Sequence, residues 1–157
     1  MTFLSGRSLA TRRLVLQGIG SVALIGFAPA LAAANDPYPE DAFKQKSDTD
    51  AIKALYGRPH EGSDKVKLDA PEIAENGAVV PVAVTTSLSD VTSISFFVSE
   101  NPNALAASYR IPEGTVPAVA NRLKMAKTCN VTAIVESGGK LYSASKEVKV
   151  TVGGCGG

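Results

Sequence analysis

The chain has 157 residues, of which 45% are hydrophobic and 20% are charged, so it can form one domain with a real core plus attached segments. The net charge is +1 only because residues 1–34 carry three arginines and no acidic residue, and the remainder is slightly acidic. Without a basic stripe or a set of aromatic residues for base stacking, the composition argues against nucleic-acid binding.

The first 34 residues have the pattern of an export signal. A basic region ends at Arg12 and Arg13, and an apolar run, LVLQGIGSVALIGFAPALAAA, follows and ends in small residues. A membrane anchor is the alternative, but Gln17, three glycines and Pro29 interrupt the run. We therefore expect a cleaved signal, and no membrane attachment after cleavage.

The paired arginines add a second expectation about export. The stretch TRRLVLQ resembles the twin-arginine signal, although Val15 and Gln17 stand where that motif favours Phe and Lys. The resemblance implies export in the folded state through Arg12 and Arg13, and a general secretory signal is the alternative. Either route predicts a periplasmic protein, in a compartment where disulfides persist.

Residues 35–64 are predicted to form an N-terminal arm with one short helix. The polar stretch ANDPYPEDAF has two prolines and is typical of a linker or extended arm. A helix is predicted over residues 49–56, with Ser47 or Thr49 as its cap, Gly57 at its end and Pro59 preventing a restart. The apolar face of this helix consists of Ala51, Ile52, Leu55 and Tyr56.

Residues 65–152 are predicted to form about seven short strands at hairpin-like spacing, which favours an all-β, antiparallel β-sandwich. Pro81 indicates an edge strand or a bulge, and residues 137–140 predict a tight hairpin. In the clearest strand, VTSISFFVSE, the run of Phe96, Phe97 and Val98 exceeds simple alternation. These three residues are candidates for a partner-facing edge, and a deep core strand is the equally good alternative. The strand-forming stretches are VKLDAPEIAENG, which ends in a turn, and AVVPVAVTTSL, VTSISFFVSE, ASYRIPEG, TVPAVANRLKMAK, CNVTAIVES and KLYSASKEVKVTV.

Little in the body of the chain predicts catalysis. His60 is the only histidine and follows a proline in a polar loop, so we expect a solvated side chain and no metal site. No Ser-His-Asp arrangement is evident, and no phosphate-binding glycine loop follows a strand. We therefore expect neither a metal nor an organic cofactor.

Two cysteines remain to be explained. Cys129 shares its strand face with Val131, Ala133 and Val135, which favours a small buried side chain. A disulfide to Cys155 and a thiol on a partner-facing edge are the alternatives, and such a disulfide would block Cys155 until it was reduced.

The C-terminus, VTVGGCGG, places Cys155 among four glycines. Glycine is costly to order, so packing should not hold this tail, and three extended residues beyond Val152 span on the order of 10 Å. The terminal carboxylate lies two residues beyond Cys155 and disfavours the thiolate. These features indicate a carrier thiol that a partner enzyme activates when the tail docks.

The tail, the leader and PEIAENGAVVPV resemble the SoxY family, the sulfur-carrying subunits of the SoxYZ complex in periplasmic thiosulfate oxidation. The resemblance implies an immunoglobulin-like fold, with sulfur held covalently on Cys155. It also implies a mobile arm made of Gly153, Gly154, Gly156 and Gly157. The carrier would catalyse nothing itself. Its implied partners are a SoxZ-like subunit, a c-type cytochrome that couples thiosulfate to the thiol, a sulfate-releasing hydrolase and, in some organisms, a sulfane dehydrogenase.

Two other classes stay open. A ubiquitin-like sulfur carrier would use the Gly156-Gly157 end as a thiocarboxylate, but the export signal and the long strand series argue against it. An exported immunoglobulin-like structural or interaction module would use its tail cysteine for a disulfide. The predicted organisation is a signal peptide at 1–34, an arm with a short helix at 35–64, the β-sandwich at 65–152 and the swinging arm at 153–157.

Overall fold

The computed structural model describes residues 38–152, and from Pro39 onward these belong to one compact unit. None of the described helices is both long enough and apolar enough to cross a membrane. The described part of the chain contains two helices, α2 (Glu40–Phe43) and α3 (Asp48–Tyr56). Its nine strands are β1 (Glu61–Gly62), β2 (Val66–Asp69), β3 (Ile73–Ala74), β4 (Val80–Thr86), β5 (Val91–Val98), β6 (Leu105–Arg110), β7 (Ala118–Leu123), β8 (Cys129–Ser137) and β9 (Lys140–Val150).

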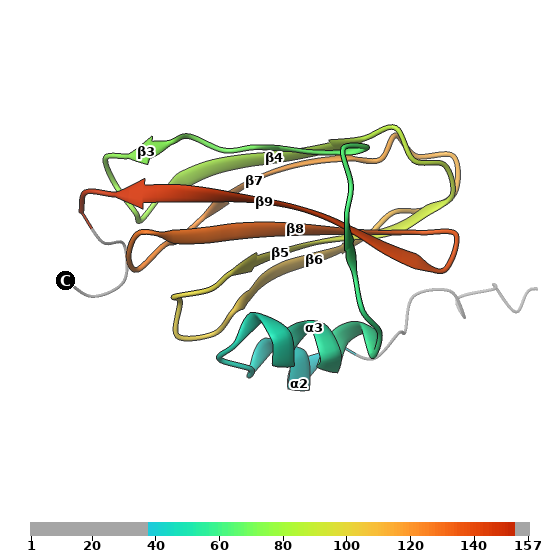
Figure 1. Ribbon diagram of the computed structural model, residues 1–157, viewed down its shortest axis with the longest axis horizontal. Coiled ribbons are helices and arrows are strands. Elements are labelled where there is room, and N and C mark those ends of the chain that lie inside the picture. Colours follow the sequence, from blue (N-terminus) through green and yellow to red (C-terminus); the bar gives the residue numbers. More distant parts are fainter. Residues whose placement is uncertain (1–37, 153–157) are drawn as a thin grey trace, which may run out of the picture. The chain divides into compact units, whose positions relative to one another are not determined.

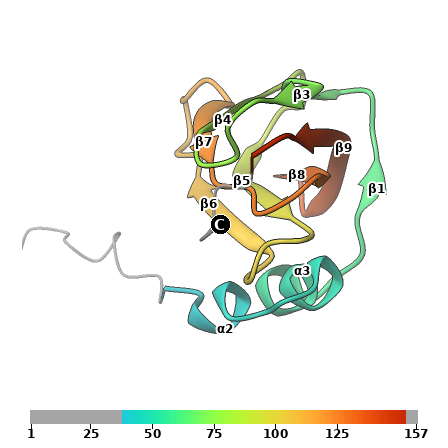
Figure 2. The ribbon, with the colours of Figure 1, turned by 90° about the vertical axis from the view of Figure 1, so that its left-hand side faces the viewer.

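The strands form two sheets packed face to face (Figures 1 and 2). One sheet has the order β1-β9-β8-β5-β6, with β3 also on β9, and the other has the order β2-β4-β7. The seven strands of four or more residues match the seven predicted ones, so the all-β, immunoglobulin-like sandwich is confirmed. One detail differs from the antiparallel prediction, because the two-residue strands β1 and β3 pair in parallel with β9.

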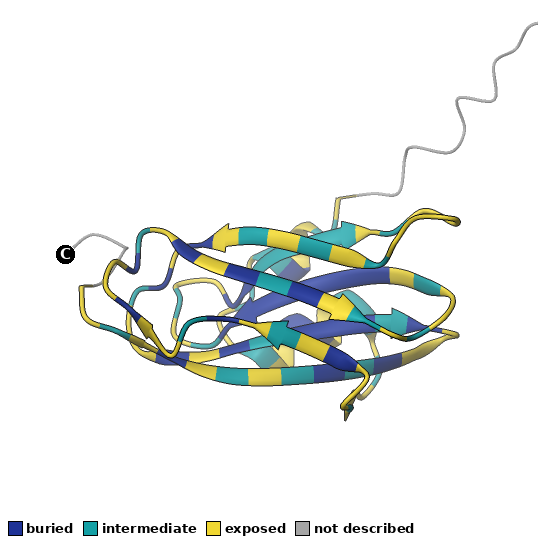
Figure 3. Ribbon diagram, turned by 90° about the horizontal axis from the view of Figure 1, so that it is seen from above, coloured by how far each residue is buried: buried dark blue, intermediate teal, exposed yellow. Residues whose placement is uncertain are grey.

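The main core lies between the two sheets. Alternate residues of β8 face it, as the sequence predicted, and the same alternation of buried and exposed positions is visible along other strands (Figure 3). The largest contributions come from Phe96, Ile94, Met125 and the valines of β4 and β8. Cys129 belongs to this core together with its strand neighbours.

A second core lies on the other face of the larger sheet, where α2 and α3 cover it (Figure 1). Phe97 and Ile134 point into this layer, opposite to the side chains of the main core. Strand β5 is therefore buried on both faces, and Phe96, Phe97 and Val98 are each 0% exposed. The prediction that these three residues form a partner-facing edge is wrong, and the deep core strand is the correct alternative.

The capping signals of α3 were predicted correctly. The Ser47 hydroxyl accepts a hydrogen bond from the Asp50 amide at 3.1 Å, and Gly57 ends the helix with a left-handed φ of 65°. The preceding stretch differs from the prediction, because residues 40–43 form helix α2 rather than an extended arm. Ala42 of α2 is buried in the second core, so packing against that core stabilises the short helix.

The predictions for the glycine hairpin and for Pro81 had different outcomes. Residues 138 and 139 are both glycines with positive φ, 53° and 76°, and form the predicted tight hairpin between β8 and β9. Pro81, however, lies in the middle strand of the smaller sheet rather than in an edge strand. Proline is tolerated there because the pairing with β2 covers only positions 83–86 of β4, so Pro81 lies opposite Arg122 alone.

Candidate functional site

The residues predicted to carry the chemistry lie at the two ends of the chain. Cys155 and its four neighbouring glycines are outside the described residues, and so are Arg12 and Arg13. What the structure describes is the chain as far as Val152, three residues before Cys155. We call residues 149–152 together with residues 72–77 the arm root.

Backbone hydrogen bonds hold the arm root as far as Val152. The Lys149 amide donates to the Glu72 carbonyl at 2.9 Å, and the Thr151 amide donates to the Ala74 carbonyl at 3.1 Å. The Thr151 hydroxyl adds a bond to the Glu75 carbonyl at 2.9 Å. The chain therefore stays attached to β3 after β9 has ended.

Neighbouring loops support the same region. The Val150 amide donates to the Thr128 hydroxyl at 2.8 Å, which ties the end of β9 to the start of β8. The Met125 amide donates to the Gly77 carbonyl at 2.7 Å, which links the turn before β4 to the segment after β7. These bonds make the arm root a fixed point at one end of the sandwich (Figure 1).

The stretch PEIAENG acquires a structural role from this arrangement. Its Ile73–Ala74 portion is strand β3, which pairs in parallel with Lys149 and Val150 of β9. The Asn76 side chain accepts a bond from the Ala78 amide at 2.8 Å and so shapes the turn that follows. The sequence predicts a strand and a turn here, but no local pattern shows which distant strand pairs with them.

Cys129 lies at the same end of the sandwich, opposite Val148 in the β8–β9 pair. It is a free cysteine, 7% exposed and packed in the main core, which confirms the predicted small buried side chain. Burial raises the pKa of its thiol, and hydrogen bonds from the Glu100 backbone and the Ser99 side chain oppose that rise only in part. The raised pKa leaves less of this thiol as the reactive thiolate, and the alternative disulfide to Cys155 lies outside the described residues.

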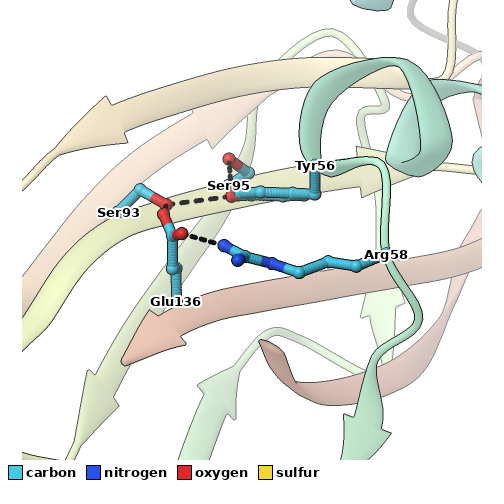
Figure 4. A network of polar contacts seen from close by, with 5 residues as sticks. All are labelled: Tyr56, Arg58, Ser93, Ser95 and Glu136. Carbon is cyan, nitrogen blue, oxygen red and sulfur yellow. Dashed lines mark hydrogen bonds and ion pairs between the residues drawn. The ribbon is translucent and has the colours of Figure 1, made fainter. Parts of the chain in front are cut away.

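A polar network lies beneath helix α3, on the outer face of the larger sheet (Figure 4). The Tyr56 hydroxyl lies 2.8 Å from the Ser95 hydroxyl and 3.2 Å from that of Ser93. Ser93 donates to Glu136 at 2.9 Å, and Glu136 forms an ion pair with Arg58. Burial raises the pKa of Tyr56, although the serine hydrogen bonds oppose this. The network satisfies buried hydroxyls and fixes α3 on the sheet, whereas the sequence identified Tyr56 only as part of an apolar helix face.

An open cleft of about 700 Å³ lies between α3 and strands β8 and β9, and Lys53, Arg58, His60 and Ser143 are among its lining residues. The predicted loop histidine, His60, is exposed but not purely solvated, because its Nδ1 lies 2.9 Å from the Ser143 hydroxyl. Within the described range, no three His, Cys, Asp or Glu side chains gather as metal ligands would.

The chain is similar to known proteins both in sequence and in structure. A family described as "Sulfur oxidation protein SoxY" matches residues 52–155, from the middle of α3 to Cys155. A solved structure described as "the sulfur carrier protein SoxY from Chlorobium limicola f thiosulfatophilum" is 47% identical, with a TM-score of 0.60. This match covers 66% of the present chain and 96% of the Chlorobium chain. No match was found among curated proteins. The extent of the family match and this identity show that the chain belongs to the SoxY family.

Proposed function

We propose that this chain is a periplasmic sulfur carrier that holds thiosulfate-derived sulfur on Cys155 and presents it to partner enzymes. One observation carries the proposal. The family match extends to Cys155. Cys155 is three residues beyond Val152 in the sequence, within a glycine-rich stretch of the kind suited to entering another protein.

Loading would form a bond between the Cys155 sulfur and the outer sulfur of thiosulfate. The thiol proton is released and two electrons pass to a c-type cytochrome partner, which leaves an S-thiosulfonate on the cysteine. A hydrolase would then add water, release the terminal sulfonate as sulfate and leave a persulfide. A sulfane dehydrogenase, where an organism has one, would oxidise the remaining sulfur. In this proposal the chain catalyses none of these steps and needs no cofactor of its own.

The proposal includes export and assembly. Residues 1–34, with Arg12 and Arg13, would direct the folded chain through the twin-arginine route. A SoxZ-like subunit would leave with it as a heterodimer, so one signal would serve both subunits. Gly153, Gly154, Gly156 and Gly157 would provide the swinging arm.

Intact mass spectrometry tests the proposal directly. The mature protein is purified without reductant from cells given thiosulfate and is measured before and after reduction, beside Cys155→Ser and Cys129→Ser variants. We expect a chain trimmed near residue 34 with a reducible adduct of one or more sulfur atoms, absent only from Cys155→Ser. An unmodified chain, or a chain two hydrogens lighter because Cys129 and Cys155 are joined, would contradict the carrier function.

A further inference from the structure

The cleft between α3 and the larger sheet follows that helix along its whole length. Four residues of α3 line it at positions i, i+1, i+4 and i+5, which lie on one face of a helix: Asp48, Thr49, Ile52 and Lys53. The lining continues past the end of the helix through residues 57–60. The cleft therefore extends from the first residue of α3 to the connection that leads to β1.

The sheet side of the cleft carries hydroxyl groups. Thr132 of β8 lies opposite Ser145 of β9, and their hydroxyl oxygens are 3.1 Å apart. Ser143, two residues earlier in β9, donates to the Glu61 carbonyl at 3.2 Å and lies 2.9 Å from Nδ1 of His60. Each hydroxyl oxygen has two lone pairs, so these side chains can accept hydrogen bonds from the amides of a bound chain.

The dimensions of the cleft decide what kind of chain fits. The nine residues of α3 span roughly 14 Å. Spread over that length, the volume of about 700 Å³ corresponds to a cross-section of roughly 50 Å², or about 7 Å across. A helix with its side chains is about 10–12 Å wide and is excluded, whereas an extended chain is narrower. At about 3.3–3.6 Å per residue, roughly four extended residues match the length.

Opposite charges lie toward the two ends of the cleft. Burial raises the pKa of Asp48 at the start of α3, and the negative charge of Glu100 adds to this rise even though Glu100 pairs with Lys127 at 3.2 Å. Lys53, further along the helix, forms no ion pair with any other of residues 38–152. Arg58 lies beyond the end of the helix. A bound segment with a basic group at one end and an acidic group at the other would complement this arrangement.

Unpaired polar atoms mark the same two ends. Among the described residues, the buried side-chain nitrogen and oxygen atoms without a hydrogen-bond partner are Oδ1 of Asp48 and Nε of Arg58. Both residues line the cleft. Such atoms are rare in native proteins and need an explanation. A carboxylate oxygen needs a donor and a guanidinium N–H needs an acceptor, so the two atoms call for partners of opposite kind.

We propose that this cleft binds an extended segment of a partner protein, about four residues long, with a basic side chain toward Asp48 and an acidic side chain toward Lys53 and Arg58. Backbone amides of the segment donate to the hydroxyl groups of β8 and β9. The site uses neither Cys155 nor the arm root, so it is independent of the proposed carrier chemistry.

NMR titrations of the full mature chain test the proposal. The probes are pools of N-acetylated, C-amidated tetrapeptides of the form Lys-X-X-Glu, with the matched pools Lys-X-X-Gln, Gln-X-X-Glu and Gln-X-X-Gln. We expect Lys-X-X-Glu to shift the backbone amide signals of residues 48–53, 57–60 and 143–145, and Gln-X-X-Gln to shift them least. If Lys-X-X-Glu causes no localised shifts, or if all four pools cause equal shifts, the proposal is wrong.

Charge variants test the two ends separately. Lys53→Gln should raise the apparent Kd for Lys-X-X-Glu roughly two- to fivefold, which is the effect of one exposed ion pair, and leave that for Lys-X-X-Gln unchanged. Asp48→Asn should raise the apparent Kd for Lys-X-X-Gln and leave that for Gln-X-X-Glu unchanged. The amide spectra also show whether each variant is folded. Arg58 is left intact because its ion pair with Glu136 holds α3 on the sheet (Figure 4).

The control and a charge reversal complete the test. Lys67→Gln removes an exposed lysine of β2, outside the cleft, and should bind all pools as wild type does. An equal loss of affinity in Lys67→Gln and Lys53→Gln would show general electrostatic attraction and overturn the site. A Lys-X-X-Lys pool should bind Lys53→Glu more tightly than it binds wild type, and the opposite order would overturn the charge matching.

Discussion

The Gly77 amide donates a hydrogen bond to the Val152 carbonyl oxygen at 2.8 Å. A residue in the turn before β4 thus holds the last described residue of the chain, 75 positions further along the sequence. Backbone hydrogen bonds therefore hold the described chain beyond the end of β9, as far as Val152.

The Thr151 side chain provides a test of the arm root. Thr151→Val removes the 2.9 Å hydroxyl bond to the Glu75 carbonyl but keeps the branched shape. We expect a loss of about 0.5–1 kcal/mol in the free energy of unfolding, which is the net contribution of one such bond. Amide hydrogen exchange at Thr151 and Gly77 should also become faster. Thr85→Val, an exposed threonine of β4, is the control, and equal exchange rates in both variants would count against the anchoring role.

The network beneath α3 predicts a stability effect at Tyr56. Tyr56→Phe removes a hydroxyl placed 2.8 Å from the Ser95 hydroxyl and should cost about 1–2 kcal/mol of unfolding free energy in urea titrations. Tyr142→Phe, at a partly buried position in β9, is the control. Equal midpoints for the two variants would show that the Tyr56 hydroxyl contributes nothing to stability.

The raised pKa of Tyr56 predicts that the free energy of unfolding falls at alkaline pH. Burial raises the pKa of Tyr56, so the folded state holds the phenolic proton more tightly than the unfolded state does. This contribution is fully present below the unfolded pKa of about 10 and is lost as pH rises through the folded pKa. Wild type should therefore lose more stability than Tyr56→Phe when urea titrations are compared at pH 9 and pH 11. Parallel losses would contradict the raised pKa.

Cys129 should react slowly in the native protein. Its thiol is 7% exposed and burial raises its pKa, so little thiolate is available to an alkylating reagent. With iodoacetamide at pH 8, we expect one rapid modification, at Cys155, and a second only after denaturation in urea. Peptide mapping identifies the sites, and rapid native labelling of Cys129 would show that this end of the core opens.

The hairpin glycines offer a test of backbone strain with a matched control. Gly139 has a φ of 76°, and a methyl group there would meet open space. Gly139→Ala should cost about 1 kcal/mol, because alanine disfavours left-handed backbone geometry. Gly62→Ala also adds a methyl group into open space but at an ordinary φ, so thermal unfolding should show little change. Similar melting temperatures for both variants would remove strain as the explanation.

Local patterns explain why much of the fold was predictable. The cap at Ser47, the left-handed Gly57 and the paired glycines of the hairpin each depend on residues within one turn. Alternation along β8 likewise placed Cys129 in the core. The burial of Phe97 was harder to predict, because an apolar run that is buried on both faces has no periodicity. Such a run looks the same in a core strand and in an exposed apolar edge.

By itself, the sequence determined the strand series, helix α3 and a single cysteine set in glycine at the end of the chain. Only the tertiary structure decided that β3 pairs in parallel with the end of β9 and that Tyr56 reaches the serines of β5. The physical reason is the range of the interactions. Periodicity and capping act between near neighbours, whereas pairing partners are selected by contacts among residues that are distant along the chain.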